Sequence, residues 1–156
     1  MDNILNFKHD FESTLPQTYA LITSGCFVVH PGVSRITLHG SRGLAGGCRC
    51  ASDIDLSLIV DALRTPNIDG YLQEVIFTTS SHWQGDVELD LAVIFDTRNC
   101  GLVCFDQRKW DDRICLIGGR DCFGLYKIQK GFTGLVNNAG IQVPLMYPCL
   151  KIWQRR

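Results

Sequence analysis

The chain lacks any apolar run near the roughly 18 residues needed to cross a bilayer, so the sequence predicts no membrane span. Its formal net charge is −1, which argues against a protein that binds nucleic acid through a general excess of positive charge. Repeats and low-complexity segments are also missing, and hydrophobic residues make up 46% of the composition. These values are typical of a globular protein, and 156 residues suit a single domain.

The start of the chain lacks the basic residues and apolar centre of a secretory signal, and it carries Asp2. We therefore expect a cytoplasmic protein whose 8 cysteines are reduced thiols. The cysteines also lack the two closely spaced pairs that structural zinc usually requires. A zinc-stabilised interaction protein, held by thiolates such as Cys100 and Cys104, remains an alternative that rests on the cysteines alone.

Hydrophobic patterning and turn residues predict the order of the elements. We expect a helix from Pro16 to about His30, a strand over 33–39, a glycine-rich turn over 40–51, a strand over 53–60, a helix over 68–78 and a strand over 87–95. This order predicts an α+β (α/β-like) domain in which helices pack on one side of a small mixed β-sheet. The core spans about residues 15–96, and 97–156 form a C-terminal elaboration of the same domain.

Within that elaboration, residues 125–128 are expected to form a strand and 145–153 to pack back on the core. The two central strands alternate cleanly between apolar and polar residues. Ile54, Leu56, Leu58 and Val60 share one face of their strand, and Asp53 and Asp55 lie on the other. In the later strand Glu88 and Asp90 likewise lie opposite Val87, Leu89, Leu91 and Val93.

Asp53 and Asp55 are two residues apart on one strand face, about 6 to 7 Å along the backbone. Their carboxylates can converge on two metal ions separated by roughly 3.5 to 4 Å, as in phosphoryl-transfer sites. Asp90, on the matching face of the later strand, is expected to supply the third carboxylate, with Glu88 as the reserve candidate. Mg²⁺ favours such carboxylates together with water and phosphate oxygens.

A glycine-serine turn precedes this acidic strand. Gly40 and Ser41 can expose backbone N–H groups to phosphate, and the Ser41 hydroxyl adds a donor. Arg42 is a candidate phosphate ligand, although it could equally face solvent. His39 beside the turn could also touch phosphate, but a packed strand histidine is the commoner outcome.

Leu38-His39-Gly40-Ser41 is followed, after eleven intervening residues, by Asp53-Ile54-Asp55-Leu56. This arrangement resembles the signature of the DNA polymerase beta-like nucleotidyltransferase superfamily, and its minimal stand-alone members most closely. The resemblance covers about residues 15–96 and implies the nucleotidyltransferase fold with Mg²⁺-dependent transfer. It implies that Gly40 and Ser41 bind the nucleoside triphosphate, and that Asp53, Asp55 and Asp90 ligate two Mg²⁺ ions.

The function expected from these residues is transfer of a nucleoside monophosphate, AMP from ATP, to a hydroxyl of a protein or small-molecule acceptor. Pyrophosphate is released, and Asp90 can accept the proton of the attacking hydroxyl. The alternative is a regulatory, antitoxin-like binding module on the same fold with little or no turnover. A homo-oligomer or a partner protein is compatible with either function.

Two further sets of cations are candidates for ligand binding. Lys127 and Lys130 could reach a triphosphate from a neighbouring strand. Segments 107–110 and 151–156 combine cations with tryptophan, which can bind nucleic acid. Such segments more often lie on the solvated surface, so nucleic acid is not the favoured partner.

Overall fold

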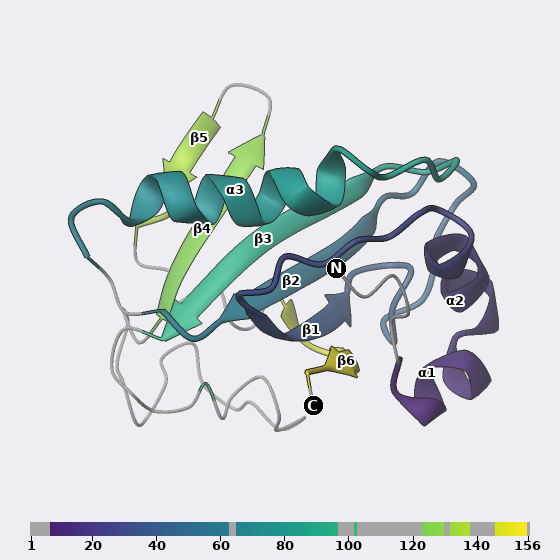
Figure 1. Ribbon diagram of the computed structural model, residues 1–156. Helices are drawn as coiled ribbons and strands as arrows, with labels where there is room; N and C mark the ends of the chain where they lie inside the picture. The colour runs from purple at the N-terminus through teal and green to yellow at the C-terminus, as the bar shows by residue number, and fades with distance from the viewer. Residues whose placement is uncertain are drawn as a thin grey trace.

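The computed structural model describes residues 7–62, 65–96, 102, 123–129, 132–137 and 146–155. These residues form a six-stranded mixed β-sheet and three α-helices (Figure 1). The helices are α1 (His9–Thr14), α2 (Pro16–Thr23) and α3 (Ile68–Ser80). The strands are β1 (Val33–His39), β2 (Ile54–Val60), β3 (Leu89–Asp96), β4 (Phe123–Gln129), β5 (Phe132–Leu135) and β6 (Leu150–Gln154). The expected α+β class is confirmed.

The strand order is β5-β4-β3-β2-β1-β6, so β2 and β3 lie at the centre of the sheet. They run parallel and are joined through α3, whereas every other neighbouring pair is antiparallel. Parallel strands begin at the same end of a sheet, and the antiparallel β1 ends there. The end of β1 and the starts of β2 and β3 therefore meet at one place.

The sheet has an apolar layer on each face. The layer under the helices contains Leu56 and Val93 from the sheet, and buried side chains from all three described helices. The opposite layer includes Ile59, Ile94, Phe123 and others. The described helices thus pack on one side of the sheet, as the sequence predicts, and α3 crosses that face in Figure 1.

The strand alternation is also confirmed. Ile54, Leu56, Leu58 and Val60 belong to the helix-side layer, whereas Ile59 belongs to the other. Each fully buried aliphatic side chain contributes about 1.5–3 kcal/mol, and a one-residue slip would turn the whole set to the wrong face. The alternation therefore fixes which face carries the carboxylates: the face away from the helices.

The expected helix from Pro16 to about His30 is too long, because α2 ends at Thr23. The hydroxyls of Thr23 and Ser24 donate to the carbonyls of Tyr19 and Ala20, at 2.8 and 2.7 Å. Cys26 then takes a positive φ of 57°, which no α-helix accommodates. The chain leaves the helix here, and residues 27–30 run on without helical structure.

The described C-terminal residues add strands at both edges of the sheet, with β4 and β5 at one edge and β6 at the other. The strand expected over 125–128 is confirmed as part of β4, and the segment expected to pack back contains β6 at the far edge. Among the described residues, no helix has the length and apolar character needed to cross a membrane.

Candidate functional site

Asp55 and Asp90 stand directly opposite each other on the central parallel strands. The register pairs Ile54 with Leu89 and Asp55 with Asp90, so both carboxylates project from the face away from the helices. Their side chains form a hydrogen bond with each other. Two carboxyl groups can do this only while one of them keeps a proton.

The glycine of the turn touches this pair. His39, the last residue of β1, is the register partner of Asp55, which brings Gly40 against the aspartate. Gly40 has φ +74°, and a Cβ atom on it would collide with Oδ2 of Asp55. Both the backbone conformation and the lack of a side chain are therefore required at this position. The Gly-Ser turn and the acidic strand predicted from sequence form one site.

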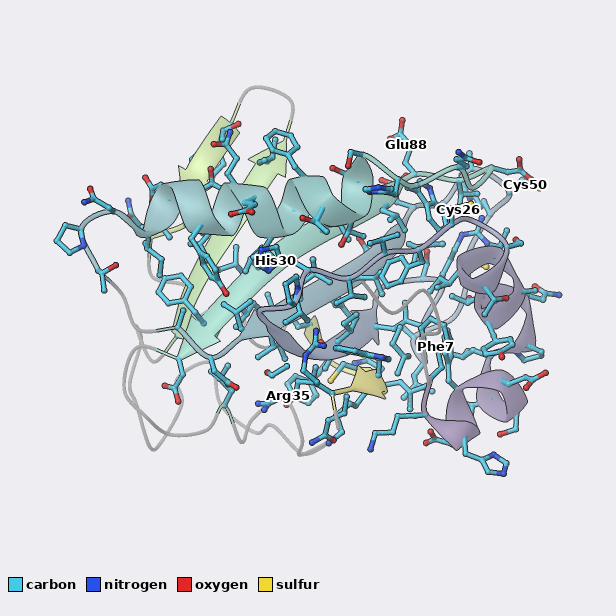
Figure 2. All side chains as sticks on the ribbon, viewed as in Figure 1. Phe7, Cys26, His30, Arg35, Cys50 and Glu88 are labelled. Carbon is cyan, nitrogen blue, oxygen red and sulfur yellow. The ribbon has the colours of Figure 1, made fainter. Side chains whose placement is uncertain are left out.

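Arg42 holds the loop between the turn and β2. Its Nε donates to the Ser52 carbonyl at 2.6 Å, and its Nη2 donates to the Arg49 and Cys50 carbonyls at 3.0 and 3.1 Å. The residue is 8% exposed. Arg42 was expected among the nucleotide ligands, but these hydrogen bonds direct its guanidinium into the loop. Figure 2 shows Cys50 at the outer end of that loop.

Thr18 ties the same loop to α2. Its hydroxyl donates to the Arg42 carbonyl at 2.7 Å, and the side chain is buried. The turn is thus fixed from the helix side by Thr18 and from the loop side by the Arg42 guanidinium. The sequence offered no signal for Thr18, because a threonine in a short helix carries no distinguishing pattern.

The remaining predicted residues lie around the pair. Asp53 is exposed and precedes β2, and its charge contributes to the raised pKa of Asp55. Glu88, the reserve candidate, is exposed just before β3, and Figure 2 shows its side chain directed outward. Ser41 is partly buried, and its hydroxyl makes no hydrogen bond within the described part of the chain. Asp90 is therefore better placed than Glu88 to act with Asp55.

The electrostatics of the pair follow from crowding of negative charge. Burial raises the pKa of Asp55 to about 7, and the hydrogen bond and the charge of Asp90 add to the effect. The Lys127 ammonium acts in the opposite direction on that pKa. Near neutral pH the pair therefore carries a proton, which a bound cation would displace.

His39 lies on the same face and is neutral near pH 7. Burial lowers the pKa of His39 to about 4, against the opposing attraction of Asp90. Its Nε2 lies 3.1 Å from the Ser57 hydroxyl, and Ser57 is fully buried. The expectation of a packed strand histidine fits this environment better than direct phosphate contact does.

Lys127 of β4 reaches the carboxylates from the other side. Its Nζ lies 3.3 Å from Oδ1 and 3.4 Å from Oδ2 of Asp90. The sequence placed Lys127 near a triphosphate but gave no sign of this ion pair. The ion pair depends on the antiparallel register that sets Lys127 opposite Ala92.

No family model, no curated protein and no solved structure matches the chain. The site must be judged by its own chemistry. Its donors are hard carboxylate oxygens at a point where two acidic groups share a proton, which suits Mg²⁺. Within the described ranges no three His, Cys, Asp or Glu side chains are grouped to hold a metal ion by themselves. The aspartate pair therefore fits an ion that takes its other ligands from water and phosphate.

The remaining residues that the sequence suggested as ligands add no support for a second binding site in the described part of the chain. Lys130, Cys100, Cys104 and segment 107–110 lie outside the described residues. In β6, Trp153 is buried and the Arg155 guanidinium lies 5.0 Å from its ring centroid. Arg155 also donates to the Val33 and His30 carbonyls, at 2.9 and 3.1 Å. Those contacts use this aromatic and this cation within the fold.

Proposed function

We propose that the protein is a Mg²⁺-dependent nucleotidyltransferase of the DNA polymerase beta-like superfamily. In this proposal it transfers AMP from ATP to a hydroxyl of a protein or small-molecule acceptor. The observation that carries the proposal is the Asp55–Asp90 pair held directly against Gly40. A phosphate-binding turn and an acidic pair are each common, but steric contact between them is what a site for a metal-bound triphosphate requires.

The proposed roles follow from the positions of the side chains. Asp55 and Asp90 would hold Mg²⁺, with Asp53 at the start of the same strand as a further donor. The ion supplies neutralisation of phosphate charge, the main requirement of phosphoryl-group transfer. Gly40 allows the triphosphate to approach the backbone closely, and the Ser41 hydroxyl donates to a phosphate oxygen.

In the proposed reaction the acceptor oxygen bonds to the α-phosphorus, and the bond from that phosphorus to its bridging oxygen breaks. Pyrophosphate leaves with the electron pair of the broken bond. Asp90 accepts the proton of the acceptor hydroxyl, for which it must be ionised. The proton shared with Asp55 must therefore leave the pair before turnover.

The test compares the position of the label in ATP. The purified protein is incubated with Mg²⁺ and a lysate, with ATP labelled either at the α- or at the γ-phosphate. Nucleotidyl transfer predicts acceptor labelling from α-labelled ATP alone, whereas a kinase would label from the γ-phosphate. Asp55→Asn and Asp90→Asn should reduce labelling at least about 100-fold. Asp61→Asn, an exposed aspartate directly after β2, is the matched control and should retain it.

The regulatory alternative predicts a different outcome of the same experiment. ATP would bind with Mg²⁺, and the binding would weaken in Asp55→Asn, but no acceptor would be labelled. Neither binding nor labelling, with Asp55→Asn equal to the wild type, would overturn both functions.

A further inference from the structure

The geometry of the ion pair between Lys127 and Asp90 affects how a metal ion and a triphosphate would bind at the proposed site. The Nζ atom lies almost equally far from the two carboxylate oxygens, at 3.3 and 3.4 Å. A cation in that position covers both oxygens of the carboxylate. The side chains of Lys127 and Asp90 are 23% and 32% exposed, so the contact is only partly open to water.

The Lys127–Asp90 contact neutralises part of the negative charge of the site. Asp53, Asp55 and Asp90 would place three negative charges together, and in the free protein the Lys127 ammonium compensates part of this charge at Asp90. A divalent cation on Asp90 needs the same oxygens that Lys127 covers. The ammonium and the metal ion therefore compete for Asp90, because both are attracted to one carboxylate and repel each other.

A lysine displaced from Asp90 cannot move far. Its backbone belongs to β4, which is hydrogen-bonded to β3 with Lys127 in register with Ala92. The ammonium is a compact charge with three rotatable donors on a flexible chain, and it binds phosphate readily. A triphosphate bound at the aspartates would bring the nearest new negative charge within its reach.

We propose that Lys127 is a positioning residue that exchanges partners: it holds Asp90 in the free protein and binds the triphosphate once the metal ion takes Asp90. This inference rests on the proposed function and names the nucleoside triphosphate as the ligand that triggers the exchange. The exchange also disfavours binding of a metal ion without a triphosphate, because the ion must then displace Lys127 while no phosphate is present to bind the ammonium.

The exchange predicts opposite changes in two affinities. Replacing Lys127 by Met removes the competitor, so Mn²⁺ alone should bind about 3- to 10-fold more tightly. The same change removes a phosphate ligand, so α,β-methylene-ATP in saturating Mg²⁺ should bind about 10-fold more weakly. Lys127→Arg keeps the charge and should resemble the wild type toward Mn²⁺. A lysine with a purely structural role would change neither affinity, or weaken both.

The experiment measures Mn²⁺ binding by electron paramagnetic resonance of the free ion, and analogue binding by calorimetry. It uses the full chain and the variants Lys127→Met, Lys127→Arg, Asp90→Asn and Lys8→Met. Lys8 lies just before α1 and is the matched lysine control, expected to leave both affinities unchanged. Circular dichroism checks that each variant is folded.

The outcomes separate the two proposals. Tighter Mn²⁺ binding with weaker analogue binding in Lys127→Met supports the exchange. Wild-type affinities in Lys127→Met, with Mn²⁺ binding lost in Asp90→Asn, overturn the exchange and leave the proposed function standing. A wild-type protein that binds Mn²⁺ and the analogue no better than Asp90→Asn overturns the proposed function, and the exchange with it.

Discussion

Gly40 lies so close to Asp55 that a single added methyl group would collide with the carboxylate oxygen Oδ2. The contact joins the end of β1 to the start of β2, because His39 and Asp55 are register partners. It makes the orientation of the Asp55 carboxylate depend on a residue that carries no functional group of its own.

The first prediction isolates that steric contact. Gly40→Ala should lower nucleotidyl transfer by at least about 100-fold, since the methyl group must displace Asp55. It should also lower the free energy of unfolding by about 1–2 kcal/mol because of the positive φ. Transfer assays and urea denaturation measure the two effects.

Gly46→Ala is the matched control for this prediction. Gly46 has nearly the same φ, +73°, but no atom lies within 4 Å of an added Cβ. This variant should show the loss of stability without the loss of activity. Equal losses of activity in the two variants would show that strain in the turn, and not contact with Asp55, is what matters.

The second prediction concerns the pH dependence of stability at Asp55. The folded protein holds a proton on Asp55 up to about pH 7, whereas the unfolded chain releases it near 3.8. The folded state therefore binds more protons between those values, and this residue's contribution to stability falls as the pH rises through them.

Asp55→Asn keeps the shape of the protonated side chain and removes the titration. Its free energy of unfolding should exceed that of the wild type by about 1–2 kcal/mol at pH 8, after allowance for solvent screening. The difference should be less than half as large at pH 5 and should vanish only near pH 3.8, where the unfolded chain also holds the proton. Denaturation in EDTA at both values provides the measurement, and a pH-independent difference would contradict the assignment.

The third prediction concerns His39. Because burial lowers its pKa to about 4, the ring should remain neutral from pH 8 down to about pH 5. The carbon-bound ring protons of His39, assigned by comparison with His39→Asn, should keep constant NMR shifts over this range. A midpoint near 6.5 would show that the ring is solvated and not packed against Ser57.

The fourth prediction tests the loop. Arg42→Met removes the side-chain donors to the Cys50 and Ser52 carbonyls and leaves the Arg49 carbonyl with the Ser52 N–H alone, so the free energy of unfolding should fall by about 2–4 kcal/mol. Amide hydrogen exchange over residues 49–52 should accelerate. The exposed Arg49→Met is the control and should stay within about 0.5 kcal/mol of the wild type.

The sequence predicted the central strands and the face that carries the aspartates, because an alternation of period two survives any detail of packing. It also favoured Asp90 over Glu88, which the register with Asp55 supports. The sequence did not predict where α2 ends or that the Arg42 side chain points into the loop. Both depend on hydrogen bonds to particular carbonyls in irregular backbone, and no periodic pattern encodes such contacts.

The ion pair of Lys127 with Asp90 could not be predicted for a different reason. It needs the register between β3 and β4, two strands separated by a long connection. The alternation of residues says which side of a strand faces the core but not how far the strand has slid along its neighbour.

The hydrogen bonds that Arg42 donates all end on main-chain oxygens. Every amino acid carries such an oxygen, so the exposed side chains of Ala45, Cys48 and Arg49 can change while the loop keeps its anchors, whereas the positive φ angles at Gly46 and Gly47 favour glycine. Divergence at these three exposed positions therefore costs the fold little, and distant relatives are best sought by the turn and strands that flank the loop. For the same reason, this loop is the place to insert an epitope or a fluorescent label beside the site.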